Sequence, residues 1–292
     1  MNRLTDSSPG RLLISCPDQP GIVSRVSSLL FSLGANIDES AQYTTDPRTG
    51  MFFMRLAFTL PGASDAADME ARVRDRFAPV AGEFSMRWQL SVASRRKRMA
   101  VFVSREDHCL LELLWQQRTG MLQVDIPYII SNHPDHEAIV RSMGFPYTHI
   151  PVSRTEKGEA EAAQLALVRD SVDFIALARY MQILSPQFIA SFGRRIINIH
   201  HSFLPAFVGA RPYERAYERG VKIIGATAHY VTEDLDAGPI IEQDVMRIHH
   251  GYSAAEMKSA GRQIERTVLA RAVRWHIDDR ILVHDNRTIV FT

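Results

Sequence analysis

The stretch "RRIINIHHSFLPAFVGARPYERAY" (residues 194–217) joins an apolar strand to a group of polar side chains. Its three isoleucines are typical of a strand inside a sheet. Asn198 and His200 are interleaved with them, and burying such groups without hydrogen-bond partners is costly. Side chains two residues apart on a strand share one side, so we expect these two to face one space and His201 to face away. The stretch therefore predicts either a hydrogen-bonded structural corner or a reaction centre.

The chain around this stretch alternates strands with helices. Apolar runs read as strands at "MAVFVS" (99–104), "VDIPYIIS" (124–131), "YTHIPV" (147–152), "VDFIALA" (172–178), "RIINIH" (195–200), "KIIGATAHYVT" (222–232) and "PIIEQDVMRI" (239–248). A long helix is predicted from Ser253 to Arg280, followed by a small hairpin. Nearly continuous apolar strands are typical of a parallel sheet covered by helices on both faces. In such α/β sheets ligands bind beyond the carboxyl ends of the strands, where Asn198 and His200 fall.

The residues before 93 show a different order of predicted strands and helices. Residues 11–92 read as strand, helix, strand, strand, helix and strand, which is the ferredoxin-like α+β order. The basic run "ASRRKRMA" (93–100) follows; it suits a solvated linker better than a phosphate contact. We therefore predict two domains, residues 1–93 and 94–292.

Composition narrows the function classes. The 292 residues include 34 Lys plus Arg and 33 Asp plus Glu. The net charge is therefore near zero and gives no overall positive potential that would attract a nucleic acid. Cys16 and Cys109 are the only cysteines, too few for a disulfide framework or a four-thiolate metal site. No long apolar segment suggests a signal peptide or a membrane span, and a cytoplasmic protein is expected.

A second informative stretch is "GATAHYVTEDLDAGPII" (residues 225–241), where a strand with His229 runs into an acidic loop containing Asp236. The loop reads either as a solvated turn or as part of a site. An Asn, a His and an Asp at neighbouring strand ends suit acyl transfer. The amide can donate to an oxyanion, the imidazole can donate a proton, and the carboxylate can orient water. No Ser or Cys nucleophile is paired with them. A metal site at His200 and His201 is not favoured, because no Cys or acidic residue lies at ligand spacing beside these two histidines.

Residues 198–244 resemble the folate-dependent formyltransferase family through the Asn-x-His motif and a His seven residues before an Asp. "SCPDQPGIVSRVSSLLFSLGANI" (15–37) is similar to the opening of ACT domains. The resemblance implies an ACT domain followed by a Rossmann-like formyltransferase domain with a mostly parallel sheet. Asn198, His200 and Asp236 match the catalytic trio, and His229 matches a further active-site histidine. The substrate-binding walls match at Met181, Gln182, Ile183, Leu184, Thr232, Glu233 and Leu235, although "MQIL" also reads as plain core packing.

The resemblance implies that 10-formyltetrahydrofolate is the substrate and that no cofactor, metal or nucleotide takes part. It also implies an amino-acid effector at the ACT domain, glycine or methionine, a homo-oligomer, and a place in one-carbon metabolism and purine biosynthesis. Members that formylate a ribonucleotide hold its phosphate with a glycine-rich loop after the first strand. Here that place reads "VFVSREDHCLLELL" (101–114), without glycine. Hydrolysis to formate and tetrahydrofolate is therefore expected. Formyl transfer to an amine and a non-catalytic amino-acid sensor remain the alternatives.

Overall fold

The computed structural model describes residues 9–46, 49–153, 155–193, 195–205 and 212–292, which form two compact units. The first unit comprises Met1–Arg96, Asp278–His284 and Ile289–Thr292, and the second comprises Lys97–Ile277 and Asp285–Thr288. The C-terminal segment therefore returns largely to the first unit, whereas a division at residue 93 alone would leave it with the second. Each unit has its own sheet and its own core.

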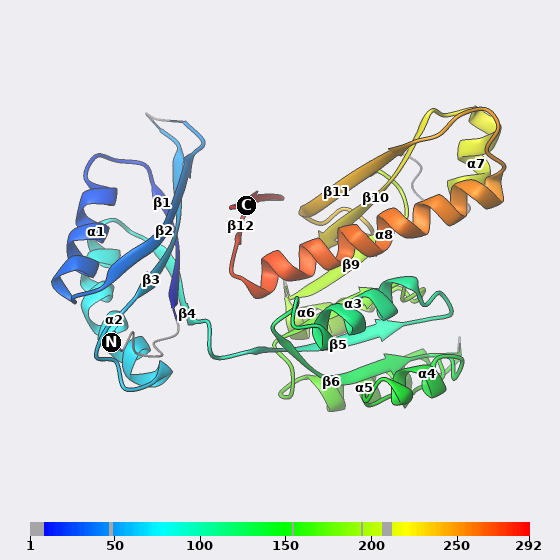
Figure 1. Cartoon of the computed structure of the whole chain (residues 1–292), viewed down its shortest axis with the longest axis horizontal. Helices are drawn as coiled ribbons and strands as arrows, with labels where there is room; N and C mark the ends of the chain where they lie inside the picture. Colours follow the sequence, from blue (N-terminus) through cyan, green and yellow to red (C-terminus); the bar gives the residue numbers. More distant parts are fainter. Residues whose placement is uncertain (1–8, 47–48, 154, 194, 206–211) are drawn as a thin grey trace. The chain divides into compact units, whose positions relative to one another are not determined.

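The first unit has the predicted ferredoxin-like order. Its elements are β1 (Gly10–Pro17), α1 (Ile22–Ser32), β2 (Asn36–Thr44), β3 (Met51–Thr59), α2 (Ala66–Glu83) and β4 (Arg87–Val92). The antiparallel sheet has the order β2-β3-β1-β4. Both helices lie on one face of it (Figure 1) and bury apolar side chains such as Val26 and Phe77 against Leu12 and Ile14.

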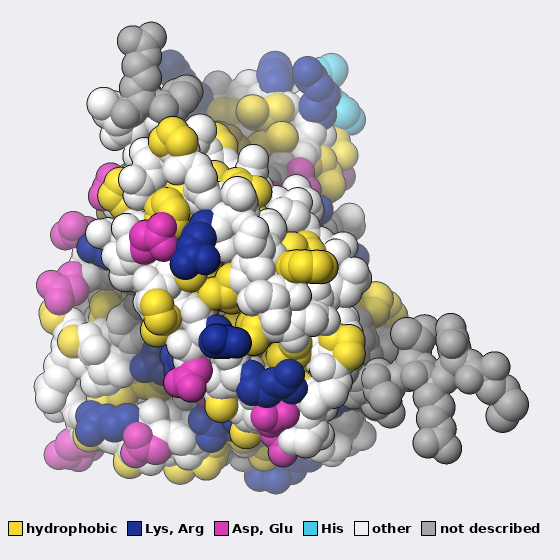
Figure 2. Space-filling model, turned by 90° about the vertical axis from the view of Figure 1, so that its left-hand side faces the viewer, with side chains coloured by type: hydrophobic (Ala, Val, Ile, Leu, Met, Phe, Trp, Pro, Cys, Tyr) yellow, Lys and Arg dark blue, Asp and Glu magenta, His cyan; other side chains and the backbone are white. Residues whose placement is uncertain are grey.

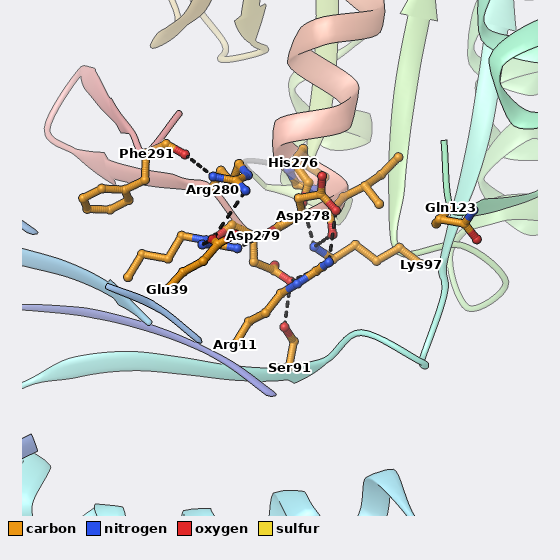
Figure 3. Close-up of polar contacts among 12 residues, drawn as sticks. Arg11, Glu39, Ser91, Lys97, Gln123, His276, Asp278, Asp279, Arg280 and Phe291 are labelled. Atoms are coloured by element: carbon orange, nitrogen blue, oxygen red, sulfur yellow. Dashed lines mark hydrogen bonds and ion pairs between the residues drawn. The ribbon is translucent and has the colours of Figure 1, made fainter. Parts of the chain in front are cut away.

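The other face of this sheet carries charged side chains together with apolar ones. The Arg55 side chain is buried there and donates to the carbonyl oxygens of Asp279 (3.0 Å) and Asp278 (3.2 Å). In Figure 3, Asp279 also accepts from Ser91, at 2.7 Å. Phe291 packs with buried apolar residues of β1 and β3. The chain's last residues are thus part of the folded N-terminal unit.

The second unit is built on a seven-stranded sheet. Its elements are β5 (Lys97–Val103), α3 (His108–Arg118), β6 (Val124–Ser131), α4 (Glu137–Ser142), β7 (Thr148–His149), α5 (Lys157–Val168), β8 (Phe174–Ala178), α6 (Pro186–Phe192), β9 (Ile196–His200), α7 (Pro212–Arg219), β10 (Ile223–Tyr230), β11 (Ile240–Arg247) and α8 (Ala254–Ile277). Strands β12 (Ile281–His284) and β13 (Arg287–Val290) form the expected hairpin.

The strand order of the large sheet is β11-β10-β9-β8-β5-β6-β7. The five strands β5 to β9 pair in parallel, and β10 is antiparallel to both of its neighbours. The prediction of a mostly parallel sheet is confirmed. From β5 the chain builds outward through β6 on one side and later through β8 on the other. Such a switch point opens a crevice beyond the strands' carboxyl ends.

Helix α8 ends three residues before the predicted boundary, at Ile277 rather than Arg280. Asp279 has a left-handed backbone (φ 49°), which a continuing right-handed helix does not permit. Within the described part of the chain, no helix is long and apolar enough to cross a membrane. On the face shown in Figure 2, basic and acidic side chains are interspersed and neither sign dominates.

Candidate active site

Strands β9 and β10 bring together the polar residues that the two sequence motifs contribute. Their antiparallel register places His229 opposite Asn198 and Thr227 opposite His200. Asn198 Nδ2 lies 3.2 Å from His229 Nε2. His229 Nδ1 lies 3.0 Å from the carbonyl oxygen of Tyr230, so this nitrogen carries a proton, and Nε2 is the ring atom that faces the Asn198 amide. The Asn198 amide is thereby held with a second N–H still to donate.

Asp236 joins this group from the loop after β10. Its Oδ2 lies 3.2 Å from His200 Nδ1, and its Oδ1 lies 3.7 Å from His229 Nε2. The interactions with His200 and then with His229 hold the pKa of Asp236 well below its usual range, against the opposite effect of burial. Nε2 of His200 is buried and has no hydrogen-bond partner among the described residues. The imidazole is therefore oriented on one side and available on the other.

The loop that carries Asp236 approaches β10 very closely. Asp236 has a left-handed backbone (φ 56°), a conformation that Asp tolerates better than most residues. A Cβ at Gly238 would lie 1.8 Å from the carbonyl oxygen of Tyr230, so no larger residue fits there without moving the loop. The glycine therefore permits the approach that brings the carboxylate to the two histidines.

The corner after β9 is fixed from the neighbouring strands. Thr227, which is fully buried, donates from Oγ1 to the Ser202 carbonyl oxygen (2.9 Å) and accepts from the Leu204 N–H (3.0 Å). Gln243 of β11 donates to the carbonyl oxygen of Leu204 and to Thr227 Oγ1, both at 2.9 Å. These bonds explain why a polar corner is stable at the end of an apolar strand.

All eleven predicted site residues line one cavity of about 460 Å³ in the second unit. They are Met181, Gln182, Ile183, Leu184, Asn198, His200, His229, Thr232, Glu233, Leu235 and Asp236. Polar groups of β9 and β10 meet there with apolar side chains that are unusually open: Met181 is 58% exposed, Ile183 62% and Leu235 62%. Exposed apolar walls beside oriented polar groups are typical of a site for a flat, partly apolar ligand.

The loop from Arg179 to Leu184 is attached to the end of β5. Ser104 Oγ accepts from the Met181 N–H (2.9 Å) and donates to Asn132 Oδ1 (2.7 Å), and the Ser104 N–H donates to the Arg179 carbonyl oxygen (3.3 Å). These contacts place the exposed Met181 and Ile183 at the cavity while the buried Leu184 packs in the core. The residues of "MQIL" thus take up both of the roles that the sequence left open.

His201 is not where strand alternation predicts. Strand β9 ends at His200, so the alternation does not continue, and the two imidazole rings lie side by side with centroids 5.1 Å apart. His201 also lines the cavity. Burial, then the positive charge of Arg179, lower the pKa of His201 from 6.5 to about 4, so it is neutral at neutral pH.

Sequence reasoning missed a buried polar cluster beside the cavity, made of His108, Arg179, Tyr213 and Glu265. Glu265 lies in α8, one position after the apolar Ile264, and its sequence context does not distinguish it from a solvent-exposed residue of that helix. Arg179 directly precedes the four residues chosen for the cavity wall. A charged residue at the carboxyl end of an apolar strand was the available signal.

Within the described residues, one group of three side chains could hold a metal ion: His108, Cys109 and Glu265, with ligand atoms within 4.8 Å of one another. Two features disfavour a cation. Arg179 Nε lies 3.3 Å from Glu265 and already supplies a positive charge. Burial, above all, raises the pKa of the Cys109 thiol, which opposes the thiolate that a metal needs.

Comparison with known proteins agrees with this architecture. Residues 97–273 match the formyl transferase family model, and residues 10–75 match the ACT domain model. A formyltetrahydrofolate deformylase of Bacillus subtilis is 55% identical over 283 residues, covering 97% of this chain and 93% of that protein. The crystal structure of a formyltetrahydrofolate deformylase from Pseudomonas syringae pv. tomato has a TM-score of 0.92 at 46% identity, covering 99% and 96% of the two chains. Glycinamide ribonucleotide transformylase 1 of Symbiobacterium toebii has a TM-score of 0.62 at 29% identity, covering 68% of this chain and 95% of that one.

Proposed function

Because the chain belongs to the formyl transferase family, and within it to the formyltetrahydrofolate deformylases, we propose that it hydrolyses 10-formyltetrahydrofolate to formate and tetrahydrofolate. The observation that carries the proposal is the pairing of His200 Nδ1 with Asp236 at 3.2 Å, next to an Asn198 amide held by His229. These groups share a cavity with open apolar walls.

In this proposal Asn198 and His200 act on the formyl oxygen. Attack on the formyl carbon places negative charge on that oxygen, and preorganised donors stabilise it. The second N–H of the Asn198 amide is one donor. His200, whose Nδ1 is held by Asp236, presents Nε2 as the other donor, and it can deliver a proton as the intermediate collapses.

Asp236 has two tasks in this mechanism. It orients His200, and it accepts a hydrogen bond from the attacking water. A carboxylate with so depressed a pKa is a weak base in the resting site. Its basicity rises as His200 turns its proton-donating capacity toward the oxyanion, because the hydrogen bond from His200 is the largest cause of the low Asp236 pKa. The proton of the water is then taken up as the carbon–oxygen bond forms.

The apolar wall receives the folate. Met181, Ile183 and Leu235 expose large apolar surfaces at the cavity, where a pterin ring can be covered. Leu177 and Val231 line the same cavity, and backbone groups of the 179–184 loop are fixed from β5. Hydrolysis on this plan uses side chains and water, with no cofactor or metal.

The region around the start of α3 supports water as the acceptor over a phosphorylated amine. Glu106 there forms ion pairs with Lys258 (2.9 Å) and Arg262, so these two cations are already engaged. His108, the first residue of α3, donates to Glu265 at 2.9 Å. An incoming phosphate would therefore meet a carboxylate and side chains that are committed elsewhere.

We further propose that the first unit binds an amino acid. Residues 10–75 match ACT domains, and the turn before α1 ends at Gly21, whose backbone is left-handed (φ 95°). The free N–H groups of such a helix start suit a carboxylate. Titration with glycine and with methionine, followed through deformylation rate, tests this assignment.

The decisive experiment incubates the purified protein with 10-formyltetrahydrofolate and no acceptor. Formate and tetrahydrofolate should appear in equal amounts. A parallel reaction with glycinamide ribonucleotide should give formate at an unchanged rate. Formylated ribonucleotide as the main product would show that the protein is a transferase and not a hydrolase. The absence of turnover in both reactions would favour the non-catalytic sensor.

A further inference from the structure

A buried carboxylate lies close to the candidate active site without taking part in the proposed chemistry. Glu265 of α8 is 1% exposed. It accepts from His108 Nε2 (2.9 Å) and Tyr213 Oη (2.8 Å), and Arg179 Nε lies 3.3 Å away. Burial acts to raise the pKa of Glu265, but the hydrogen bond from His108 and the charge of Arg179 outweigh it and lower that pKa. Glu265 is therefore ionised and can hold a cation at the cavity.

That cation is Arg179, which stands at the carboxyl end of β8. Its side chain is 9% exposed, it lines the same cavity as Asn198 and His200, and its backbone is left-handed (φ 60°). Nε makes an ion pair with Glu265 but no hydrogen bond. Among the residues that the structure describes, neither Nη group has a hydrogen-bond partner. An arginine has five N–H donors, so most of this fork remains available to a ligand.

Arg179 also lies near the groups proposed to act on the formyl unit. Its charge is, after burial, the largest cause of the low pKa of His201, and the rings of His200 and His201 are 5.1 Å apart. A neutral His201 beside the guanidinium adds no second positive charge. Among the described residues that line the cavity, Arg179 is the one arginine or lysine; its Nε pairs with Glu265, and its Nη groups remain open.

The reaction creates an anion that its substrate lacks. Water forms a new bond to the formyl carbon, and the bond from that carbon to N10 of the folate breaks. N10 takes one proton and a second is released, so a neutral formamide becomes a formate ion. We propose that Arg179 forms a formate subsite, which receives the two carboxylate oxygens through its Nη groups as the product forms.

This inference rests on the proposed function and adds to it. Transfer of the formyl group to an amine yields another neutral formamide, which carries no negative charge for a buried guanidinium to bind. A planar arginine fork matches a carboxylate in two parallel hydrogen bonds. Arg179 would then distinguish hydrolysis from transfer at the level of the product, independently of how the folate is bound.

The test measures formate binding without turnover. Sodium formate is titrated into the protein saturated with tetrahydrofolate and followed by ¹³C-formate line broadening, with chloride as the ionic-strength control. Arg179→Gln should weaken formate binding about tenfold or more, as expected for lost charge-assisted hydrogen bonds. Arg179→Lys should lie between, because it keeps the charge but not the fork. Arg141→Gln, which removes an exposed arginine paired with Glu137, is the matched control and should leave formate binding unchanged.

A merely structural role for Arg179, as counter-ion of Glu265, gives a different result. The double variant Arg179→Gln/Glu265→Gln removes both charges and so avoids an unpaired buried carboxylate. The subsite predicts that formate binding is still lost in this folded protein, with tetrahydrofolate binding retained. If the double variant bound formate within about twofold of the wild type, the proposal would be overturned, because losing even one hydrogen bond to a charged group should cost more than that. A wild type that binds no formate would also overturn it. Because no turnover is measured, these outcomes are separate from a failure of the hydrolase assay.

Discussion

Asn198 and His229 face each other across adjacent antiparallel strands, with Nδ2 of the amide 3.2 Å from Nε2 of the imidazole. The other ring nitrogen of His229 is tied to the Tyr230 carbonyl oxygen at 3.0 Å. The orientation of the amide is therefore set by a backbone group of β10, through a histidine that is only 2% exposed. In the proposed mechanism His229 is therefore a positioning residue, and Asn198 is the group that would contact the substrate.

The first prediction separates these two roles. Asn198→Ala removes an oxyanion donor and should lower kcat by about 10²–10³. His229→Ala leaves the donor in place but unheld, so its loss in kcat should be smaller, with the KM for the folate nearly unchanged. Steady-state kinetics on both variants decide the matter. A larger loss in the His229 variant than in the Asn198 variant would make His229 a catalytic group.

The second prediction concerns Asp236. Asp236→Asn keeps the shape of the loop but removes the charge that orients His200 and the water, so turnover should collapse while tetrahydrofolate binding persists. His200→Ala should lose on the order of 10²–10⁴ in kcat, the usual worth of a general acid or base. Equilibrium folate binding, measured beside kcat, checks that the site is intact. Near-normal turnover in a folded Asp236→Asn protein would exclude the proposed role.

The depressed pKa of Asp236 also has a consequence for stability. Its contribution is present above the unfolded-state pKa of aspartate, near 3.9, and is lost as pH falls through that value toward the lower folded pKa. The Tm difference between wild type and Asp236→Asn should therefore shrink as pH falls below about 4. A difference that grew on acidification would contradict the assignment.

The apolar runs were sufficient for most of the strands, whereas the residues of the cavity wall came from the family resemblance and not from a pattern in the residues themselves. Strand ends carrying Asn198, His200 and Asp236 could be recognised because polar residues interrupted apolar runs, and the parallel sheet placed those ends together. The cluster around Glu265 could not be found this way. Its members come from α3, the loop after β8, α7 and α8, and spacing along one chain does not show which elements meet. The prediction that His201 faces away was wrong because the sequence does not fix the last residue of β9, and strand alternation stops at His200.

A third prediction uses His201. Its pKa of about 4 in the folded state lies below the unfolded value of 6.5, so the unfolded chain binds more protons between these values. Folding stability should consequently fall as pH decreases from 6.5 toward 4. In His201→Gln that part of the slope should be absent, which a series of Tm measurements at pH 4.5–7 would show. Titration of the His201 ring by NMR with a midpoint near 6.5 would contradict the premise.

The fourth prediction tests the approach of the Asp236 loop to β10. Gly238→Ala places a methyl group against the Tyr230 carbonyl oxygen, so the loop must move away and take the carboxylate with it. We expect both kcat and Tm to fall, because Gly238 is buried and the added methyl group would clash with backbone that cannot rotate away. Gly158→Ala is the control: it lies in α5 with no atom within 4 Å of the new Cβ. That variant should keep full activity and gain about 0.5–1 kcal/mol.

The last prediction concerns the C-terminal return into the first unit. Arg55 lies in β3, its side chain is 4% exposed, and it donates to the carbonyl oxygens of Asp278 and Asp279 while pairing with Glu39 at 2.5 Å. Arg55→Met keeps much of the volume but leaves two carbonyl groups without these donors. Loss of such a buried charged donor should destabilise the unit by about 3 kcal/mol.

The measurement for Arg55→Met is native-state hydrogen exchange of the amides in β1 and β3, which reports this unit separately from the rest of the chain. Arg25→Met is the matched control, because its pair with Glu83 is about half exposed on both sides and such pairs contribute within about 1 kcal/mol. Faster exchange throughout β1 and β3 in the Arg55 variant alone is the expected pattern. Equal exchange in both variants would mean that the C-terminal segment merely lies against the sheet. If the expected pattern is found, a chain ending at Ile277 should destabilise the same strands, because removing residues 278–292 takes away the carbonyl groups and the Phe291 side chain together.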